Sequence, residues 1–542
     1  MTAAALLFSA TLALPALMLL AGLWPPARGP LLGLVWLAPL PAVAASLAAS
    51  GKAVILDLPQ ARLTFALDAP GAVLLGVSAV LWIAAGFYAN TYLRDSPYRT
   101  RFAARWLLTL TGNMGVFIAA DFLSFYLLFA VVSLAAYGLV VFDGTARARR
   151  AASIYLALAI LGEALLLLGF VLMAEAIPGS SLLIADGVAA LAASPHGTAA
   201  LVLLFAGFGL KAGLAPLHVW LPLAHPAAPM PASAVLSGAI VNAGVIGLIR
   251  VLPAPGFADC GIGLAAVGLF TAFYAVVIGI TQHNPKTILA YSTASQMGVV
   301  AAVLGMTLAT MDSDGTLAAS FYAAHHALAK AAAFLAIGAV AVCAPRQARL
   351  VLILTAIAVL GLGGLPFSGG ALAKAAVKEP LGDGMVGLLA NISAVSTTLL
   401  MVWFLGRLAK ETPQHAAHSP APQNLFVPFA VTAAGAVIVP WVLYPVLIGS
   451  LADALTLRTL WSALWPVLLG GSAGLVLLRG RVRLPSLPEG DIIVVGEAGM
   501  RYGAALGTSL VWLEARLQHW PVACLMLLLV AGAIGVAMIA AQ

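Results

Sequence analysis

The chain has 542 residues, of which 63% are hydrophobic and 8% are charged, whereas a soluble domain has about 25% charged residues. This composition excludes a soluble globular protein and is typical of a polytopic membrane protein. The net charge of +7 does not indicate a nucleic-acid partner, because the basic residues are spread over many short connections.

Apolar stretches of about 20 residues, the length that crosses a bilayer as a helix, recur along the whole chain. We predict an all-α membrane protein with about 14 to 16 transmembrane helices. The first stretch has no basic residue before it and has the length of a full span, so we expect a retained helix and not a cleaved signal. The predicted spans are 3–23, 30–49, 71–92, 103–120, 122–142, 152–174, 198–222, 232–252, 262–282, 287–307, 317–343, 349–373, 384–409, 424–447, 453–478 and 521–541.

Basic residues concentrate in the odd-numbered connections between these spans. By the positive-inside rule these connections are cytoplasmic, which places the N-terminus outside and, with about sixteen spans, the C-terminus outside as well. The residues concerned are Arg28, Arg94, Arg99, Arg101, Arg105, Arg147, Arg149, Arg150, Lys286, Arg346, Arg349, Arg407 and Lys410.

Two segments outside the spans have patterns of their own. Residues 52–68 are rich in β-branched and polar side chains and predict a small external hairpin. Residues 479–520 mix apolar and charged residues at helical spacing, which predicts an amphipathic cytoplasmic segment. This segment either lies on the membrane surface or is a docking arm for a neighbouring subunit.

Two predicted spans contain a lysine next to helix-breaking residues. Pro216 follows Lys211 in the seventh span, and GLGGLPFSGGALAK (361–374) brings Pro366 and five glycines before Lys374 in the twelfth. Broken helices free backbone groups that lipid cannot satisfy, and corresponding breaks in two halves of a chain indicate a repeat with ion sites near the midplane. The fourth to eighth and the ninth to thirteenth spans form units of five helices, an odd number, so the repeat is expected to be inverted.

This organisation predicts four regions. They are 1–100, N-terminal helices with the external hairpin; 101–252, a first half-channel; 253–410, a second, inverted half-channel; and 411–542, C-terminal helices with the amphipathic cytoplasmic segment.

Four ionisable residues lie near the middle of spans: Glu163, Lys211, Lys330 and Lys374. Such residues are costly in a bilayer and indicate function, although a single lysine can also snorkel or form a structural salt bridge. A free lysine has a pKa near 10.4, and burial can lower it by roughly 3 to 5. A carboxylate about 4 Å away contributes roughly 4 kcal/mol in the opposite direction, so the approach of an acid loads or unloads a proton. Glu163 and Lys211 are the expected pair.

Four histidines and three cysteines were considered as further site residues. His325 and His326 precede Lys330 and could relay protons or be core histidines satisfied by hydrogen bonds. His218 and His225 lie near the expected cytoplasmic end of the broken seventh helix, as a proton entrance or as interfacial anchors. Neither pair has a third metal ligand at convincing spacing, and the cysteines, Cys260, Cys343 and Cys524, show no CxxC spacing. We therefore predict no cofactor, no metal and no catalytic residue.

Four stretches of the chain carry a family resemblance. They are KAGLAPLHVWLPLAHPAAPMPASAVLSG (211–238), TQHNPKTILAYSTASQMG (281–298), HHALAKAAAFLAIG (325–338) and GLPFSGGALAK (364–374). Over about residues 100 to 410 the chain resembles the antiporter-like proton-channel subunits of respiratory complex I, group 4 hydrogenases and Mrp-type sodium/proton antiporters. The resemblance implies two inverted five-helix half-channels, with broken seventh and twelfth helices, in a multisubunit complex.

The resemblance also assigns roles by position. Lys211 matches the broken-helix lysine of the first half, Lys330 the connecting lysine, His325 or His326 the eleventh-helix histidine, and Lys374 the terminal lysine of the second half.

Two departures stand out. Ala130 occupies the position of a fifth-helix glutamate, and Asn242 that of an eighth-helix lysine. The first half then either relies on Glu163, since relatives can carry an acid on the sixth helix, or has lost autonomous pumping.

These observations lead to the expectation of a proton-translocating membrane subunit, related to NADH:quinone oxidoreductase or group 4 hydrogenase. Whether it belongs to an enzyme stays open, because no self-contained active site is expected. The expected partners are other membrane subunits, a redox or soluble catalytic module and the lipid bilayer of a bacterial inner membrane. The alternatives are an Mrp-type Na⁺/H⁺ antiporter subunit, the membrane subunit of an inorganic-carbon uptake pair, and a non-pumping structural anchor. Glu163 as the one mid-membrane acid favours protons over sodium, whereas Ala130 and Asn242 favour the anchor.

Overall fold

The computed structural model describes residues 2–58, 61–179, 181–252, 255–411, 423–480, 484–485 and 487–494. The chain divides into two compact units, Met1–Glu489 and Gly490–Gln542, and all the elements below belong to the first. The predicted last span, 521–541, and most of the predicted amphipathic segment, 479–520, lie outside the described residues.

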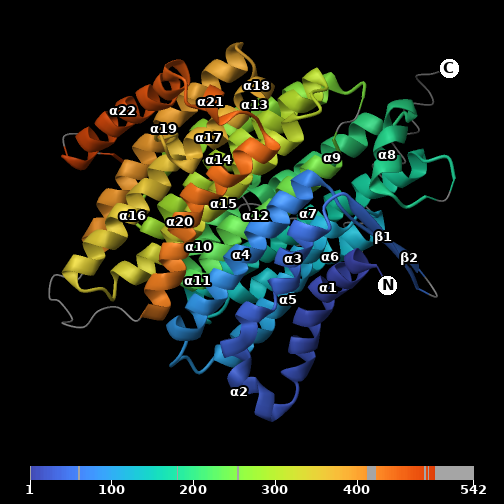
Figure 1. The fold of residues 1–542 in the computed structure, drawn as a ribbon, viewed down its shortest axis with the longest axis horizontal. Helices are drawn as coiled ribbons and strands as arrows, with labels where there is room; N and C mark the ends of the chain where they lie inside the picture. The colour runs from blue at the N-terminus through green and yellow to red at the C-terminus, as the bar shows by residue number, and fades with distance from the viewer. Residues whose placement is uncertain are drawn as a thin grey trace, which may run out of the picture. The chain divides into compact units, whose positions relative to one another are not determined.

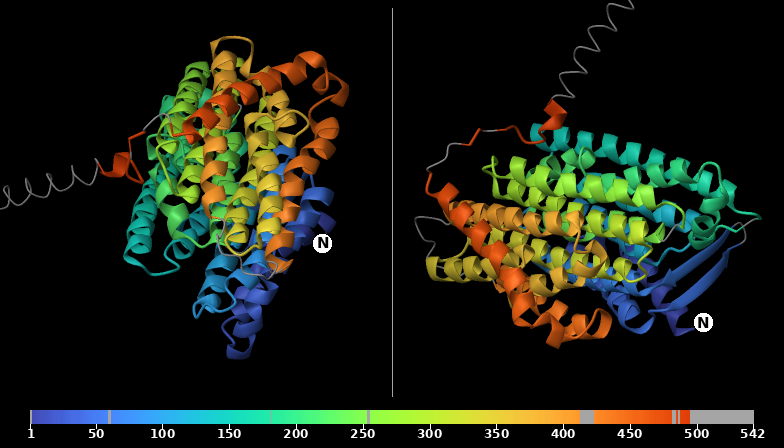
Figure 2. Two further views of the ribbon diagram at one scale, coloured as in Figure 1. Left: turned by 90° about the vertical axis from the view of Figure 1, so that its left-hand side faces the viewer. Right: turned by 90° about the horizontal axis from the view of Figure 1, so that it is seen from above.

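Helices make up nearly all of the described part of the first unit and run side by side in a bundle (Figures 1 and 2). Thirteen of them are long and apolar enough to cross a membrane, and a bent pair raises the number to 14. This confirms the predicted class of polytopic all-α membrane protein. The helices are α1 (Ala3–Ala21), α2 (Pro25–Leu34), η1 (Val35–Leu37), α3 (Leu40–Ala48), α4 (Ala69–Tyr92), α5 (Arg99–Ile118), α6 (Phe122–Val140), α7 (Ala146–Ala176), α8 (Ile184–Ala190), η2 (Leu191–Ala193), α9 (Gly197–Ala212), η3 (Leu217–Val219), α10 (Trp220–Ala227), α11 (Met230–Val235), the π-helical η4 (Leu236–Ile240), α12 (Val241–Arg250), α13 (Ala258–Gly279), α14 (Pro285–Thr310), α15 (Gly315–Val340), α16 (Pro345–Gly363), α17 (Gly369–Ala376), α18 (Lys378–Leu381), α19 (Met385–Leu408), η5 (Ala409–Glu411), α20 (Gln423–Leu447), α21 (Leu451–Ala454) and α22 (Leu457–Leu478).

The span count differs from the expected sixteen at two places within the described residues. The second predicted span is the bent pair, α2 with η1 and α3, which turns by 70°. The fourth corresponds to α5, a helix that is not among the thirteen. Its sequence carries three arginines and Asn113, which lower its hydropathy.

The predicted hairpin is confirmed. Strands β1 (Lys52–Leu58) and β2 (Ala61–Leu67) pair antiparallel, with Lys52 opposite Leu67. The carboxylate of Asp121 accepts hydrogen bonds from the backbone N–H of Thr64 at 2.6 Å and of Ser124 at 2.7 Å. The same carboxylate therefore caps the start of α6 and attaches the hairpin to this helix. That the hairpin is external stays a prediction.

The centre of the bundle is formed by α14, α15 and the α11–α12 segment, each completely buried over a span-length stretch. Glycines let α13 and α14 approach to backbone contact. A Cβ atom built on Gly268 would lie 2.5 Å from the carbonyl oxygen of Gly298, and one on Gly261 would lie 2.5 Å from that of Gly305. Polar residues on α14 and α15 are therefore held inside protein and not in lipid.

Helical backbone ends at both places where prolines and glycines accompany a lysine. Helix α9 ends at Ala212, and Gly213 follows with a left-handed φ of 88° before α10 begins at Trp220. Helix α16 ends at Gly363, and Gly364 has a φ of 97° before α17 begins at Gly369. Glycine tolerates this conformation at no steric cost. The relation of the two segments by an inverted repeat, and the four predicted regions, stay predictions.

Candidate functional site

Lys211 lies in the last turn of α9 and is 3% exposed. Its Nζ atom donates to the hydroxyl oxygens of Ser133 on α6 and Tyr155 on α7, both at 3.1 Å. The Tyr155 hydroxyl donates to the Ser133 carbonyl oxygen at 2.7 Å. The rings of Phe129 and Tyr155 lie 5.8 and 5.4 Å from the same ammonium group, within the range of a cation–π attraction. The charge is thus held by neutral oxygens and aromatic faces.

Glu163 lies two turns beyond Tyr155 on α7 and is 8% exposed. Its carboxylate is an electrostatic neighbour of Lys211 and of Ser133, without a hydrogen bond of normal length to either among the described residues. The structure therefore brings together the pair that the sequence suggested. Ala130, the position of the missing acid, precedes Ser133 by one turn on α6.

Lys330 lies in the middle of α15 and is fully buried. Its Nζ atom donates to the carbonyl oxygen of Leu289 on α14 at 3.0 Å. His326, one turn earlier, is an electrostatic neighbour of Lys330, and neither of its ring nitrogens has a hydrogen-bond partner within the described residues.

His225 lies in the last turn of α10 and is also fully buried. Its ring stacks on Phe334 of α15, with centroids 4.7 Å apart, and it is an electrostatic neighbour of Lys286 and Lys330. Lys286 is 8% exposed, and its Nζ atom donates to the carbonyl oxygen of Ala228, just after α10, at 2.5 Å. The sequence predicts Lys286 only as a charge in a connection between spans, because it follows the polar residues 281–284. In the structure it lies in the first turn of α14.

His218 and Asn242 lie in the segments before and after α10 and α11. His218 is buried in η3, with its ring edge-on to Tyr274 at 5.4 Å. Asn242 bonds within its own segment, donating to the Gly238 carbonyl oxygen at 2.9 Å. The same π-helical stretch meets α14 through the Ser237 and Thr293 hydroxyls, 2.7 Å apart. The Asn242 amide oxygen has no hydrogen-bond partner in the described part of the chain.

Lys374 on α17 is half-buried and lines a cavity of about 380 Å³. Its Nζ atom donates at 2.8 Å to the Gly363 carbonyl oxygen, which the end of α16 leaves free. The cavity wall includes a chain of hydrogen bonds in which the Tyr322 hydroxyl donates to Gln296 at 2.7 Å and the Gln296 amide donates to Thr397 at 3.0 Å. Lys374 therefore faces a polar space.

His325 belongs to this end of the series. Its ring packs against glycines near the end of α16 and at the start of α17. A Cβ atom on Gly361 would lie 3.3 Å from Nε2, and one on Gly370 would lie 2.9 Å from Cε1. It is an electrostatic neighbour of Lys374. The adjacent histidines thus face different lysines, since His326 is next to Lys330.

Sequence reasoning missed the neutral partners of the lysines. They are Ser133, Tyr155, Gln296, Tyr322 and Thr397, uncharged residues in apolar spans, where hydroxyl and amide side chains are common. Polar residues on facing helices would have been the only signal.

A family profile described as NADH:quinone oxidoreductase/Mrp antiporter, transmembrane, matches residues 119–400. This is more than half of the chain and includes every predicted site residue. The chain belongs to this family.

One curated relative and two solved structures show how far the likeness of this antiporter-family chain to known proteins extends. Hydrogenase-4 component B of Escherichia coli is 30% identical over 52% of this chain and 44% of the relative, so the match spans less than half of that protein. A chain of the Mrp complex from Dietzia sp. superposes with a TM-score of 0.77 at 20% identity, covering 100% of this chain and 63% of that one. A chain of the archaeal membrane-bound sulfane sulfur reductase gives a TM-score of 0.69 at 21% identity, covering 87% and 99%. The two structures establish the shared fold.

Proposed function

We propose that this antiporter-family chain is a proton-translocating membrane subunit of a multisubunit complex. The observation that carries the proposal is a series of lysines inside the bundle, the buried Lys211 and Lys330 and the half-buried Lys374. Their ammonium groups bond to neutral oxygens. No carboxylate lies within ion-pair distance of these three in the described residues. Their charge is therefore not fixed by a salt bridge, and a change in a nearby charge can move a proton on or off.

Several features support this proposal over the snorkelling alternative. Lys211 and Lys330 are 3% and 0% exposed, and each bonds to an oxygen inside the bundle. A transmembrane potential supplies about 2.3 kcal/mol per charge per 100 mV, which is comparable with the electrostatic effect of one nearby charge in a protein. The energy that the membrane potential supplies per proton and the energy by which one nearby charge changes the proton affinity of a lysine are thus of similar size.

The partners and location follow from the same proposal. The structural neighbours come from complexes whose names describe an Mrp complex and a respiratory membrane complex. We propose that this chain likewise assembles with other membrane subunits, with a redox or catalytic module as the source of energy, in a bacterial inner membrane. Exchange of protons for sodium is the second candidate, and it predicts transport that depends on a sodium gradient.

Vesicles that contain the whole complex test the proposal. We expect Lys211→Ala and Lys374→Ala each to reduce coupled proton transport by about 100-fold or more, the usual contribution of a positioned proton-transfer group. Lys410→Ala, at an exposed position in η5 just after α19, is the control and should leave transport unchanged. Undiminished, coupled transport in both the Lys211 and the Lys374 variant would leave only the structural-anchor alternative.

A further inference from the structure

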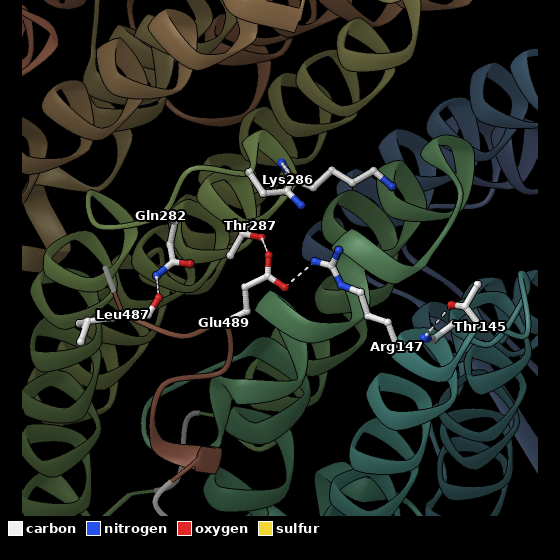
Figure 3. A network of polar contacts seen from close by, with 9 residues as sticks. Thr145, Arg147, Gln282, Lys286, Thr287, Leu487 and Glu489 are labelled. Carbon is white, nitrogen blue, oxygen red and sulfur yellow. Dashed lines mark hydrogen bonds and ion pairs between the residues drawn. The ribbon is translucent and has the colours of Figure 1, made fainter. Parts of the chain in front are cut away.

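Residues 487–489 follow α22 in sequence but lie against the beginnings of α7 and α14 (Figure 3). The Gln282 amide donates to the Leu487 carbonyl oxygen at 3.1 Å. The Thr287 hydroxyl donates to one carboxylate oxygen of Glu489 at 2.9 Å, and Arg147 forms an ion pair with the other. Two parts of the chain that are far apart in sequence, the first turn of α7 and residues 282–287 at the start of α14, therefore hold this short segment.

The segment lies at the outer end of a basic series, which is formed by the buried groups Lys286, His225 and Lys330. Thr287, its hydrogen-bond donor, directly follows Lys286, whose ammonium group turns inward to the Ala228 carbonyl oxygen. Arg147, its ion-pair partner, acts electrostatically on Lys286, as does Asp143. From Lys286 the electrostatic neighbours continue inward through His225 to Lys330. Both side chains that bind Glu489 are thus linked to the outermost buried lysine.

The ion pair between Glu489 and Arg147 is partly exposed to solvent. The side chains of Arg147 and Glu489 are 56% and 30% exposed, and an ion pair exposed to this extent is among the weaker ones in proteins. Glu489 is also the last residue of the first compact unit, and the chain continues directly into Gly490–Gln542.

We propose that Glu489 is a latch that, when bound to Arg147 and Thr287, closes the Lys286 end of the basic series, and that its release opens this end to water. This proposal rests on the proposed proton-translocating function, and it makes Glu489 a residue that regulates access to the same site. Glu489 is a positioning residue here, because it acts through Thr287 and Arg147.

The first test measures access directly. Ala228 is 1% exposed and contacts Lys286 through its backbone oxygen, so Ala228→Cys introduces a thiol without removing that bond. The variant is made with Cys260, Cys343 and Cys524 replaced by serine, and the assembled complex in inside-out membranes is treated with a membrane-impermeant maleimide. We expect Glu489→Ala to raise the modification rate about tenfold, equivalent to about 1.4 kcal/mol of latch stability.

Matched variants separate the latch from a general surface effect. Arg149→Gln, on the same first turn of α7, and Glu175→Gln, at its other end, should change the rate by less than about twofold. The charge swap Arg147→Glu with Glu489→Arg should restore slow modification, because it restores the ion pair. An unchanged rate in Glu489→Ala, or an equal increase in the two controls, would overturn the proposal.

The second test holds the latch shut. In Thr287→Cys with Glu489→Cys, a short, reducible bifunctional thiol reagent should lower proton transport about tenfold, and a reductant should restore it. Equal transport before and after reduction would count against the latch. Labelling of the thiol in Ala228→Cys does not require proton transport. A complex in which labelling depends on Glu489 but which transports no protons would therefore contradict the proposed function and not the latch.

Discussion

At the scale of single residues, the surroundings of Lys211 divide two tasks between two kinds of group. The Ser133 and Tyr155 hydroxyls hold the Nζ atom in place, and a hydroxyl can accept from an ammonium or donate to a neutral amine. Glu163 adds a charge close by without a hydrogen bond of normal length to the lysine. Position and charge are therefore set by different side chains, which lets the charge vary while the lysine stays in place.

Glu163→Gln tests whether this acid replaces the one absent at Ala130. Glutamine keeps the shape and removes the charge, so we expect coupled proton transport to fall about tenfold, as for the loss of a 1.4 kcal/mol interaction. Glu175→Gln, at the exposed end of the same helix, is the control. The measurement is dye-detected proton uptake by vesicles that contain the complex. Full activity of Glu163→Gln, together with a large loss in Lys374→Ala, would show that the first half does not pump.

The sequence identified the charged residues of these clusters and not their neutral partners. Lys211, Glu163 and Lys374 were found because a charge in an apolar span is rare. Tyr155 and Ser133 were missed because a hydroxyl in a span is ordinary and their contact with Lys211 depends on how α6, α7 and α9 face one another. The faces that these helices turn toward one another are set by packing between helices, which cannot be read from the pattern of a single sequence.

At the scale of helices, the close pair α13 and α14 shows what brings polar residues into the centre. Gly268 faces the backbone of Gly298 and Ala302, so the two helices touch without intervening side chains. This contact holds α14 in the interior, with Lys286 at its start and Gln296 in its middle. Without a hydrophobic effect between helices in lipid, close packing of this kind is a main source of association.

Gly268→Ala is expected to destabilise the bundle. Its Cβ atom would lie 2.5 Å from the Gly298 carbonyl oxygen and 2.6 Å from the Ala302 nitrogen, so the helices must separate. Overpacking of this kind costs about 1 to 3 kcal/mol, measured as the free energy of unfolding of the purified complex in mixed micelles. Gly263→Ala, on the same helix with no atom within 4 Å of the new methyl group, should show no loss. Equal stability of the two variants would argue against the contact.

The elements themselves were largely predictable, for physical reasons. Each described span has the apolar length that a bilayer requires, and the ends of α9 and α16 fall where glycine and proline stop a helix. The bend between α2 and α3 was missed because Pro25, Pro26 and Pro30 lie at the start of a stretch that is otherwise continuous and apolar. The contact of residues 487–489 with α7 was missed because its partner is more than 300 residues away.

At the scale of the whole membrane unit, α7 relates the two ends of the bundle. Its first turn carries Arg147 and Arg149, whereas Leu183, shortly after its last turn, pairs with Asp121, which binds the β-hairpin. The arginines and the hairpin therefore lie at opposite ends of one long helix. This geometry agrees with the distribution of basic charges, which predicts that the first end is cytoplasmic.

Labelling from one side at a time tests this orientation. Lys52 on the hairpin and Arg149 on α7 are both exposed, so Lys52→Cys and Arg149→Cys place thiols at the two ends with little expected change in stability, within about 0.5 kcal/mol. In a background without the native cysteines, an impermeant maleimide should modify residue 52 in right-side-out vesicles and residue 149 only in inside-out vesicles. The reverse pattern would invert the proposed direction of the latch, because Glu489 binds next to Arg149 at Arg147. Modification of both thiols from the same side would contradict a helix α7 that spans the membrane.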